Sequence, residues 1–500
     1  MGIASRVRHD VTDRAIRAAG AAAKYALDTS PGLRRQLAAA AGALLSYEGA
    51  KRPYFDKTWG TGAEGPTSVV LDSLPTLRAR SRYLVRNNPH ARRAIKSLTH
   101  GLVGTGLIPR TKSDKQDQLW RDFARECIVD SDMGFNGAQS VISDAAYESG
   151  GCLIRRRPRL KTDGLTVPLQ IEIMETDMLD TTMDTNTAFN DEGATIMGGI
   201  EFNRIGQRIA YHVYKQHPAE SSSFGGDQSV RVPASEIAHF FLPDRPGQVQ
   251  GAPALSSVIQ ALNQLDGYRL SERIGKRLRA SVVAFVNGGD ETGLAGGAES
   301  DGQTPARMLE NIGPGAVIPT PEGSQTTFPQ SVSDTSYPAY LKAELHAIAA
   351  GAGSTYEQMT GDLEGVNYSS IRAGLLNFRG EQQNTRENFL ISMALDIVYG
   401  WFVDAAMLTG QLPMTAQRYP EWSRPAHVDI DRVKEANADK LELESKTRSP
   451  QDVIGSKGRD WRKTIDEWAA AQAYADSKGV SLDAVSQNVT VEEEEGDDDE

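Results

Sequence analysis

The chain has 500 residues, 39% of them hydrophobic and 24% charged, a composition of ordinary folded protein that excludes global disorder. Its two cysteines, Cys127 and Cys152, are too few for a disulfide framework and lack zinc-site spacing, so we expect a reducing compartment. The formal net charge of −12 argues against tight nucleic-acid binding, because phosphate binding is driven by clustered lysine and arginine.

The first fifty residues predict an alanine-rich helical arm. Its arginines are scattered among alanines instead of preceding an apolar block, so the segment is no secretory signal. No window approaches eighteen uninterrupted apolar residues, and we expect no membrane contact. At the other end, VEEEEGDDDE carries eight acids and predicts a disordered, solubilising tail; a docking signal or a DNA-mimicking repellent remain alternatives.

Residues 73–88 predict a basic amphipathic helix, because Leu77 and Leu84 lie on one face with arginines between them. The Asn88-Pro89 pair ends that helix, and a second helix runs to Gly101 or Gly104. The arginines could contact phosphate, but a solvated face paired with neighbouring acids is the favoured interpretation. Shorter helices are predicted over 119–127 and 138–148.

Residues 152–241 contain short β-branched and aromatic runs separated by Gly, Asn, Asp and Pro, which predict a mainly β region. Paired carboxylates in this region could hold two divalent ions, as in a metal-dependent nuclease. An exposed strand edge and turn, with Ile171 and Ile173 facing inward, is the favoured interpretation. The candidate acids are Glu172, Glu175, Asp177 and Asp180.

Helical spacing returns after Pro253 and predicts one long amphipathic helix to about Arg279. The second half of this helix is basic beyond what solubility requires, so it is a candidate for DNA proximity, with salt bridges between subunits as the favoured alternative. Its candidate channel residues are Arg269, Arg273, Lys276, Arg277 and Arg279.

Further helices are predicted along the rest of the chain. One runs over 340–350, and another of roughly forty residues begins near Ser369 or Ser370 with a break near Gly380. Two more cover 431–444 and 459–478. A search for a Walker A loop, H-E-x-x-H, G-x-S-x-G or an EF-hand loop finds none, so we expect no catalysis, cofactor or metal.

Three stretches resemble the lambda-type phage portal family. DSLPTLRARSRYLVRNNPHARRAIKSLTHGLVGTGLIPR (72–110) looks like its N-terminal signature, an Arg-rich helix, an Asn-Asn-Pro stop and a Val-Gly-Thr-Gly turn. LHAIAAGAGSTYEQMTGDLEGVNYSSIRAGLLNFR (345–379) resembles its block with a Gly-rich helix end, Tyr-Glu-x-Leu/Met and Tyr-Ser-x-x-Arg. Residues 427–461 resemble its closing segment. The blocks keep the family's order; Ala352 and Ser354-Thr355 depart from its Leu and Val-Pro or Val-Ser.

The resemblance implies a mixed α+β chain with a portal fold: a β-containing wing, long stem and tunnel helices, a small clip and a helical crown. The implied divisions are an N-terminal helical arm (1–50), the N-terminal part of the wing (51–250), stem helix 1 (251–280), the clip (281–335), stem helix 2 (336–352), the tunnel loop (353–368), a long tunnel and wing helix (369–426), the crown (427–485) and the disordered acidic tail (486–500). The implied tunnel-loop residues are Thr355, Tyr356, Glu357, Gln358, Met359, Asp362, Glu364, Asn367 and Tyr368.

The resemblance also implies a function that is geometric and not enzymatic. Members form a ring, usually a dodecamer, at one capsid vertex, through which terminase packages double-stranded DNA and from which DNA is later ejected. Implied partners are other copies of the chain, the large terminase subunit, the major capsid and scaffolding proteins, a head-tail adaptor and weakly, non-specifically bound duplex DNA. The implied location is the virion, after assembly in the host bacterial cytoplasm. The alternatives are a metal-dependent nuclease of the packaging machinery, or a head-to-tail adaptor, a class that is generally much shorter.

Overall fold

The computed structural model describes residues 65–129, 132–184, 195–220, 229–287, 316–320, 337–364, 368–423, 425 and 432–480. The predicted N-terminal arm, most of the expected clip, Asn367 and the acidic tail lie outside these ranges. The chain divides into two compact units, Met1–Gly65 and Pro66–Glu500, and the elements below belong to the second.

Helices α3 (Pro66–Asn87) and α4 (Pro89–Val103) meet at Asn88, as the sequence predicts. The Asn88 side chain accepts a hydrogen bond from the Ala91 backbone N–H at 2.9 Å, which caps α4. The Asn88 side-chain amide also donates a hydrogen bond to Asp266 at 2.8 Å, which links the junction of α3 and α4 to a helix farther along the chain. α3 begins earlier than expected, because Pro66 suits the first turn of a helix.

Helices α5 (Asp114–Glu126) and α6 (Phe135–Ser149) confirm the two shorter predicted helices. They help to enclose a core of aromatic rings that belong to distant parts of the chain. The Trp120 ring lies 5.0 to 5.4 Å, centroid to centroid, from four of them. The four partners of Trp120 are Phe123, Phe135, Tyr399 and Phe402.

The predicted β region forms two antiparallel sheets. The first has the order β3-β2-β8, and the second the order β4-β5-β6-β7. Ile171 on β3 is fully buried and Ile173 is partly buried, in agreement with their predicted inward direction. The strands are β2 (Cys152–Pro158), β3 (Leu169–Glu175), β4 (Thr195–Met197), β5 (Ile200–Phe202), β6 (Arg208–Val213), β7 (Val230–Pro233) and β8 (Ile237–Phe240).

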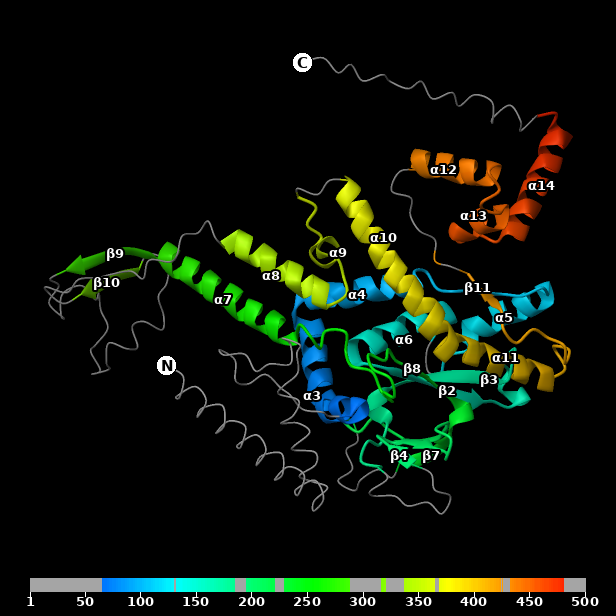
Figure 1. The fold of residues 1–500 in the computed structure, drawn as a ribbon, viewed down its shortest axis with the longest axis horizontal. Coiled ribbons are helices and arrows are strands. Elements are labelled where there is room, and N and C mark those ends of the chain that lie inside the picture. Colours follow the sequence, from blue (N-terminus) through cyan, green and yellow to red (C-terminus); the bar gives the residue numbers. More distant parts are fainter. Residues whose placement is uncertain are drawn as a thin grey trace, which may run out of the picture. The chain divides into compact units, whose positions relative to one another are not determined.

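Two long helices, α7 (Ile259–Ser281) and α8 (Tyr337–Gly351), lie side by side (Figure 1). They run antiparallel, because Ser257 before α7 donates to the Gly351 carbonyl at the end of α8 at 2.9 Å. α7 begins after a turn over 254–258, later than the predicted start at Pro253. Beyond α7, the strands β9 (Val282–Asn287) and β10 (Ala316–Thr320), which the sequence did not predict, pair in parallel.

The predicted forty-residue helix is present, but its irregularity is not at Gly380. α10 (Tyr368–Thr385) continues without a break into a π-helix (Arg386–Leu395) and then α11 (Asp396–Leu408). The π-helix begins where the buried Arg386 side chain donates to the Gly101 and Leu102 carbonyls, at 2.6 Å each, at the end of α4. The irregularity therefore coincides with a contact to another helix and not with Gly380.

One described helix, Ser370–Leu408, is long and apolar enough to cross a membrane by length and composition. Of its most apolar window, 56% is buried inside the protein. Tyr399 and Phe402 of this helix belong to the aromatic core described above, so packing accounts for much of its apolar character.

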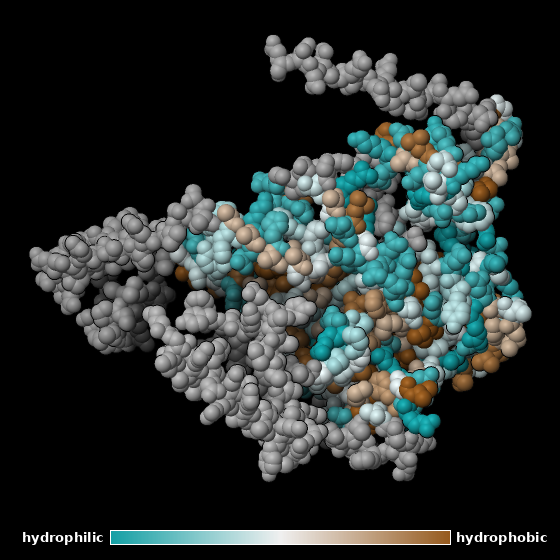
Figure 2. All heavy atoms as spheres, in the orientation of Figure 1, coloured by the Kyte–Doolittle hydropathy of each residue, from teal (hydrophilic) through white to brown (hydrophobic). Residues whose placement is uncertain are grey.

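The C-terminal helices are α12 (Arg432–Glu444), α13 (Pro450–Ser456) and α14 (Trp461–Lys478), and α13 was not predicted. Ala475 is their one buried residue. Large apolar side chains stay exposed instead, including Leu441 at 64% and Trp468 at 67%. Figure 2 shows hydrophobic residues at the surface over these helices. This part of the chain has hardly any core of its own.

Candidate functional site

The predicted channel cations lie along the second half of α7. Arg269 is 4.0 Å from Asp266, and Lys276 is 3.7 Å from Glu272, so each has an acid within one helical turn. Lys276 also lies over the Tyr337 ring of α8, 5.2 Å from its centroid. Arg273 and Arg277 are exposed. Arg279 lies within the helix, and its side chain is not among those that the structure describes.

The short helix α9 (Tyr356–Thr360) begins the predicted tunnel loop and is fixed at both ends. Thr355 and Gln358 form a reciprocal capping box at its start. The Tyr356 ring stacks on His346 of α8 at 4.1 Å, and its hydroxyl donates to Asp362 at 2.9 Å. Burial and the Asp362 carboxylate together raise the pKa of Tyr356. The loop therefore has a rigid base.

The predicted tunnel-loop residues differ in exposure. Met359 is 2% exposed and belongs to the core, so it anchors α9 inside the protein. Glu364 is exposed, and its backbone N–H donates to Asp362 at 2.9 Å, which with Tyr356 lowers the pKa of Asp362. Leu363 between them is 63% exposed, a position that sequence reasoning passed over. Tyr368 opens α10, and its side chain is outside the description.

The four candidate acids do not share one site. Glu172 pairs with Arg157, at 2.5 Å to one guanidinium nitrogen and 2.6 Å to another. Asp180 accepts hydrogen bonds from the hydroxyls of Thr182, Tyr214 and Ser229. These two carboxylates therefore have partners in different surroundings, and the four acids do not form the single carboxylate cluster that the nuclease hypothesis proposed.

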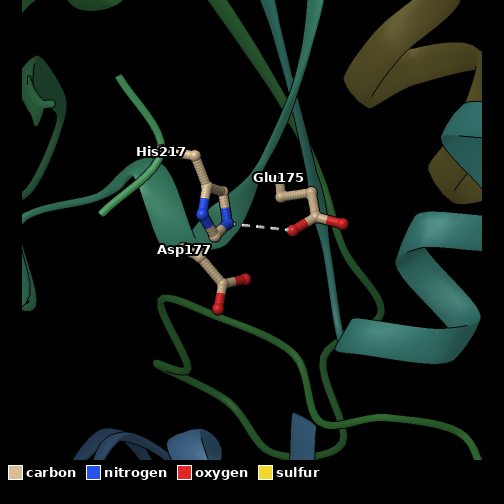
Figure 3. A group of neighbouring side chains, drawn as sticks. All are labelled: Glu175, Asp177 and His217. Atoms are coloured by element: carbon tan, nitrogen blue, oxygen red, sulfur yellow. Dashed lines mark hydrogen bonds and ion pairs between the residues drawn. The ribbon is translucent and has the colours of Figure 1, made fainter. Parts of the chain in front are cut away.

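The other two acids, Glu175 and Asp177, come together with His217 (Figure 3), with ligand atoms within 4.8 Å of one another. Arg82 of α3 donates to Glu175 at 2.9 Å and to Asp177 at 2.8 Å. Burial favours the neutral Asp177, but the hydrogen bond from Arg82 and the charge of Arg78 outweigh it and lower the pKa of Asp177. A guanidinium thus supplies the positive charge that a metal ion would bring.

Arg78 shows what the basic face of α3 does. It is 5% exposed, lies 3.7 Å from Asp177, and donates to the Ser149 carbonyl, Thr176 and Gln250 at 2.6 to 3.0 Å. Burial lowers its pKa to about 10. The predicted pairing with acids is confirmed for Arg78 and Arg82, whereas the predicted solvated position is wrong for Arg78, because these partners lie on segments that pack over α3.

A hollow of about 360 Å³ between α4 and α10 is lined by four basic side chains and by no Asp or Glu. Lys96 pairs with Asp144 at 2.6 Å, and Arg93 donates to the Gln358 carbonyl of α9 at 3.0 Å. The basic residues of α4 are visible in the sequence, but the sequence does not show that they lie beside α10 in the fold. The four are Arg93, Lys96, His100 and Arg379.

Comparison with known proteins identifies the class. Residues 54–386 match the family model described as phage portal protein, lambda family, and the chain belongs to this family. A "probable portal protein" of Halomonas phage phiHAP-1 is 25% identical over 440 residues, 83% of this chain and 84% of that protein. "Portal protein B" of Escherichia phage lambda is 20% identical over 459 residues, 81% of this chain and 85% of that protein.

Among solved structures, a chain in the neck of an empty gene transfer agent particle is similar with a TM-score of 0.40 and 14% identity. The similarity covers 76% of this chain and 92% of that one. The family is a structural one, and the mixed helix and sheet architecture described above agrees with the α+β class expected for it.

Proposed function

We propose that copies of this chain form a closed ring of about twelve subunits at one capsid vertex, a portal through which duplex DNA enters during packaging and leaves at ejection. The observation that carries the proposal is the family match over residues 54–386, which contains α3 to α10. We infer a geometric role in which terminase supplies the force and the ring supplies the passage.

The divisions of the subunit follow from this role. We assign the two sheets and the aromatic core to the wing, α7 and α8 to the stem, and α12 to α14 to the crown. Residues 281–335 are the clip, which meets terminase and later the head-tail adaptor, and residues 353–368 are the tunnel loop. Other partners are the major capsid and scaffolding proteins. We place the assembled ring in the virion, after assembly in the host cytoplasm.

The cations of α7 fit weak contact with a sliding duplex. Two of them have acidic neighbours within one turn, which moderates their attraction for phosphate. Arg273 is exposed and is the favoured contact. The basic hollow between α4 and α10 lies beside Gln358 of the tunnel loop and is a second candidate. Such contacts centre DNA without reading its bases.

Native mass spectrometry of the purified full chain, with negative-stain images of the same sample, tests the proposal. We expect closed rings of about twelve copies with a central opening. A stable monomer under all assembly conditions contradicts the ring. The same preparation, incubated with duplex DNA and Mg²⁺, tests the nuclease alternative, which requires cleavage that Glu175→Gln together with Asp177→Asn abolishes.

A further inference from the structure

A second hollow, of about 330 Å³, opens between α3 and α7. Leu84 and Ile259 line it and are 3% and 5% exposed, so its floor is aliphatic. Ala79 and the ring of Tyr83, which is 58% exposed, also line it. Arg80 is the charged residue of the lining and is exposed to solvent. The hollow suits an aliphatic side chain with an acid beside it.

Leu363 is such a side chain, because it stands between Asp362 and Glu364 at the base of the tunnel loop. It is 63% exposed although the backbone around it is fixed. Gly361 ends α9 in the left-handed conformation, φ 75°, and Asp362 accepts hydrogen bonds from Tyr356 and from the Glu364 backbone. A side chain presented on a fixed base loses little conformational entropy when it docks.

The helices that form the hollow, α3 and α7, and the helix that precedes Leu363, α9, have different neighbours. α3 contacts α7, whereas α9 contacts α8 and α4, and α8 lies between α7 and α9 (Figure 1). A closed ring requires a heterologous contact, in which one patch of a subunit meets a different patch of the next. The hollow between α3 and α7 and the projecting residue after α9 provide such a pair.

We propose that Leu363 of one subunit inserts into the α3–α7 hollow of its neighbour, with Glu364 facing the neighbour's Arg80. The proposal rests on the ring proposed above and names one of its contacts. Charge complementarity supports it, because an exposed cation lines the hollow and acids flank the leucine. The base of each tunnel loop would then be attached to the stem of the next subunit, which couples neighbouring loops around the ring.

Disulfide trapping in assembled rings tests this contact. Subunits carrying L363C are mixed with subunits carrying A79C, and we expect cross-linked dimers only in the mixture. The natural thiols of Cys127 and Cys152 give little background, because both are fully buried and burial raises their pKa to about 12. The matched control is L376C mixed with A79C, since Leu376 on α10 is similarly exposed, at 55%.

Charge exchange provides a second readout. R80E and E364R should each raise the subunit concentration at half assembly, and the double variant should recover most of the loss. L363D should raise that concentration by roughly tenfold or more, and L376D by less than about twofold. Rings in which L363C cross-links no better than L376C overturn the contact and leave the ring intact. Failure of the wild-type chain to form rings overturns both proposals.

Discussion

The aromatic core assigned to the proposed wing and the C-terminal helices differ in how their apolar side chains are packed. In the wing, Trp120 contacts four aromatic rings, and Tyr399 and Phe402 are fully buried. In α12 to α14, Trp468 and Tyr474 are 67% and 68% exposed, and Ala475 is the one buried residue. α12 and α13, with 13 and 7 residues, fall in the length range in which isolated helices are marginally stable without packing. The aromatic core of the proposed wing is packed within one chain, whereas the C-terminal helices leave large apolar side chains exposed in the single chain. In the proposed ring, we expect neighbouring copies to cover this apolar surface.

The largest expected effect is a loss of folding stability when the aromatic core of the wing is disrupted. Trp120→Ala should destabilise the wing by about 3–5 kcal/mol, because it removes the centre of the aromatic cluster. Trp468→Ala, the matched control on α14, should change the stability of the isolated subunit by less than about 0.5 kcal/mol. Chemical denaturation followed by circular dichroism measures both. Equal losses would mean that α14 packs as the wing does.

The next largest effect concerns the buried hydrogen bonds that Arg78 of α3 donates. Arg78→Met should cost about 3 kcal/mol, because the Ser149 carbonyl, Thr176 and Gln250 lose a buried donor and Asp177 loses a neighbouring charge. Arg80→Met, two residues along the same helix, is the control, since Arg80 is exposed. The same denaturation experiment compares them. A loss below about 1 kcal/mol for Arg78→Met would show that solvent replaces these bonds.

A smaller effect depends on pH. His239 on β8 is 3% exposed, its ring nitrogens have no hydrogen-bond partner, and burial with the charges of Arg208 and Arg78 lowers its pKa well below the usual value. The unfolded chain binds this proton first, so stability is full above about pH 6.5 and is lost below it, by at most about 1.4 kcal/mol per pH unit. His239→Phe should flatten the stability curve between pH 6.5 and 5. An unchanged slope would assign the acid sensitivity to other groups.

The smallest effect concerns the assembled ring and DNA. Arg273→Ala should make the salt dependence of duplex binding by rings shallower without altering sequence preference, because only phosphate contacts are lost. Arg125→Ala serves as the control, since Arg125 is 80% exposed on α5 and already lies near Asp122. Filter binding over a range of salt concentrations measures both. If the salt dependence of DNA binding has the same slope for both variants, Arg273 does not contact the duplex and α7 does not line the channel.

Local features of the fold were readable from the sequence. The α3–α4 boundary follows from two residues, because the Asn88 side chain caps α4 and Pro89 is the first residue of that helix. The π-helix at Arg386 could not be predicted in this way, because it begins at a contact with the backbone carbonyls of residues 101 and 102, which are far away in the chain. Likewise, the arginines of α3 were visible as a pattern, but the burial of Arg78 depends on segments more than sixty residues away.

The candidate site was predictable to a similar degree. The cations of α7 and the predicted tunnel loop were identified from the sequence pattern and the family resemblance, and their roles stay predictions. The sequence could not show that Met359 is buried while Leu363 is exposed, because that depends on how α9 packs against α4 and α8. The hollow between α3 and α7 was equally hidden, since it forms only where two distant helices meet.

Hydrogen–deuterium exchange on the full chain, as dissociated subunits and as assembled rings, tests the difference between the two regions most directly. In dissociated subunits we expect slow exchange in α5, α6 and α11 and fast exchange in α12 to α14. In rings we expect α14 and the outer face of α7 to become protected while the wing stays unchanged. Equal protection of α14 in both states would contradict the account, because it would show that these helices are already complete within one subunit.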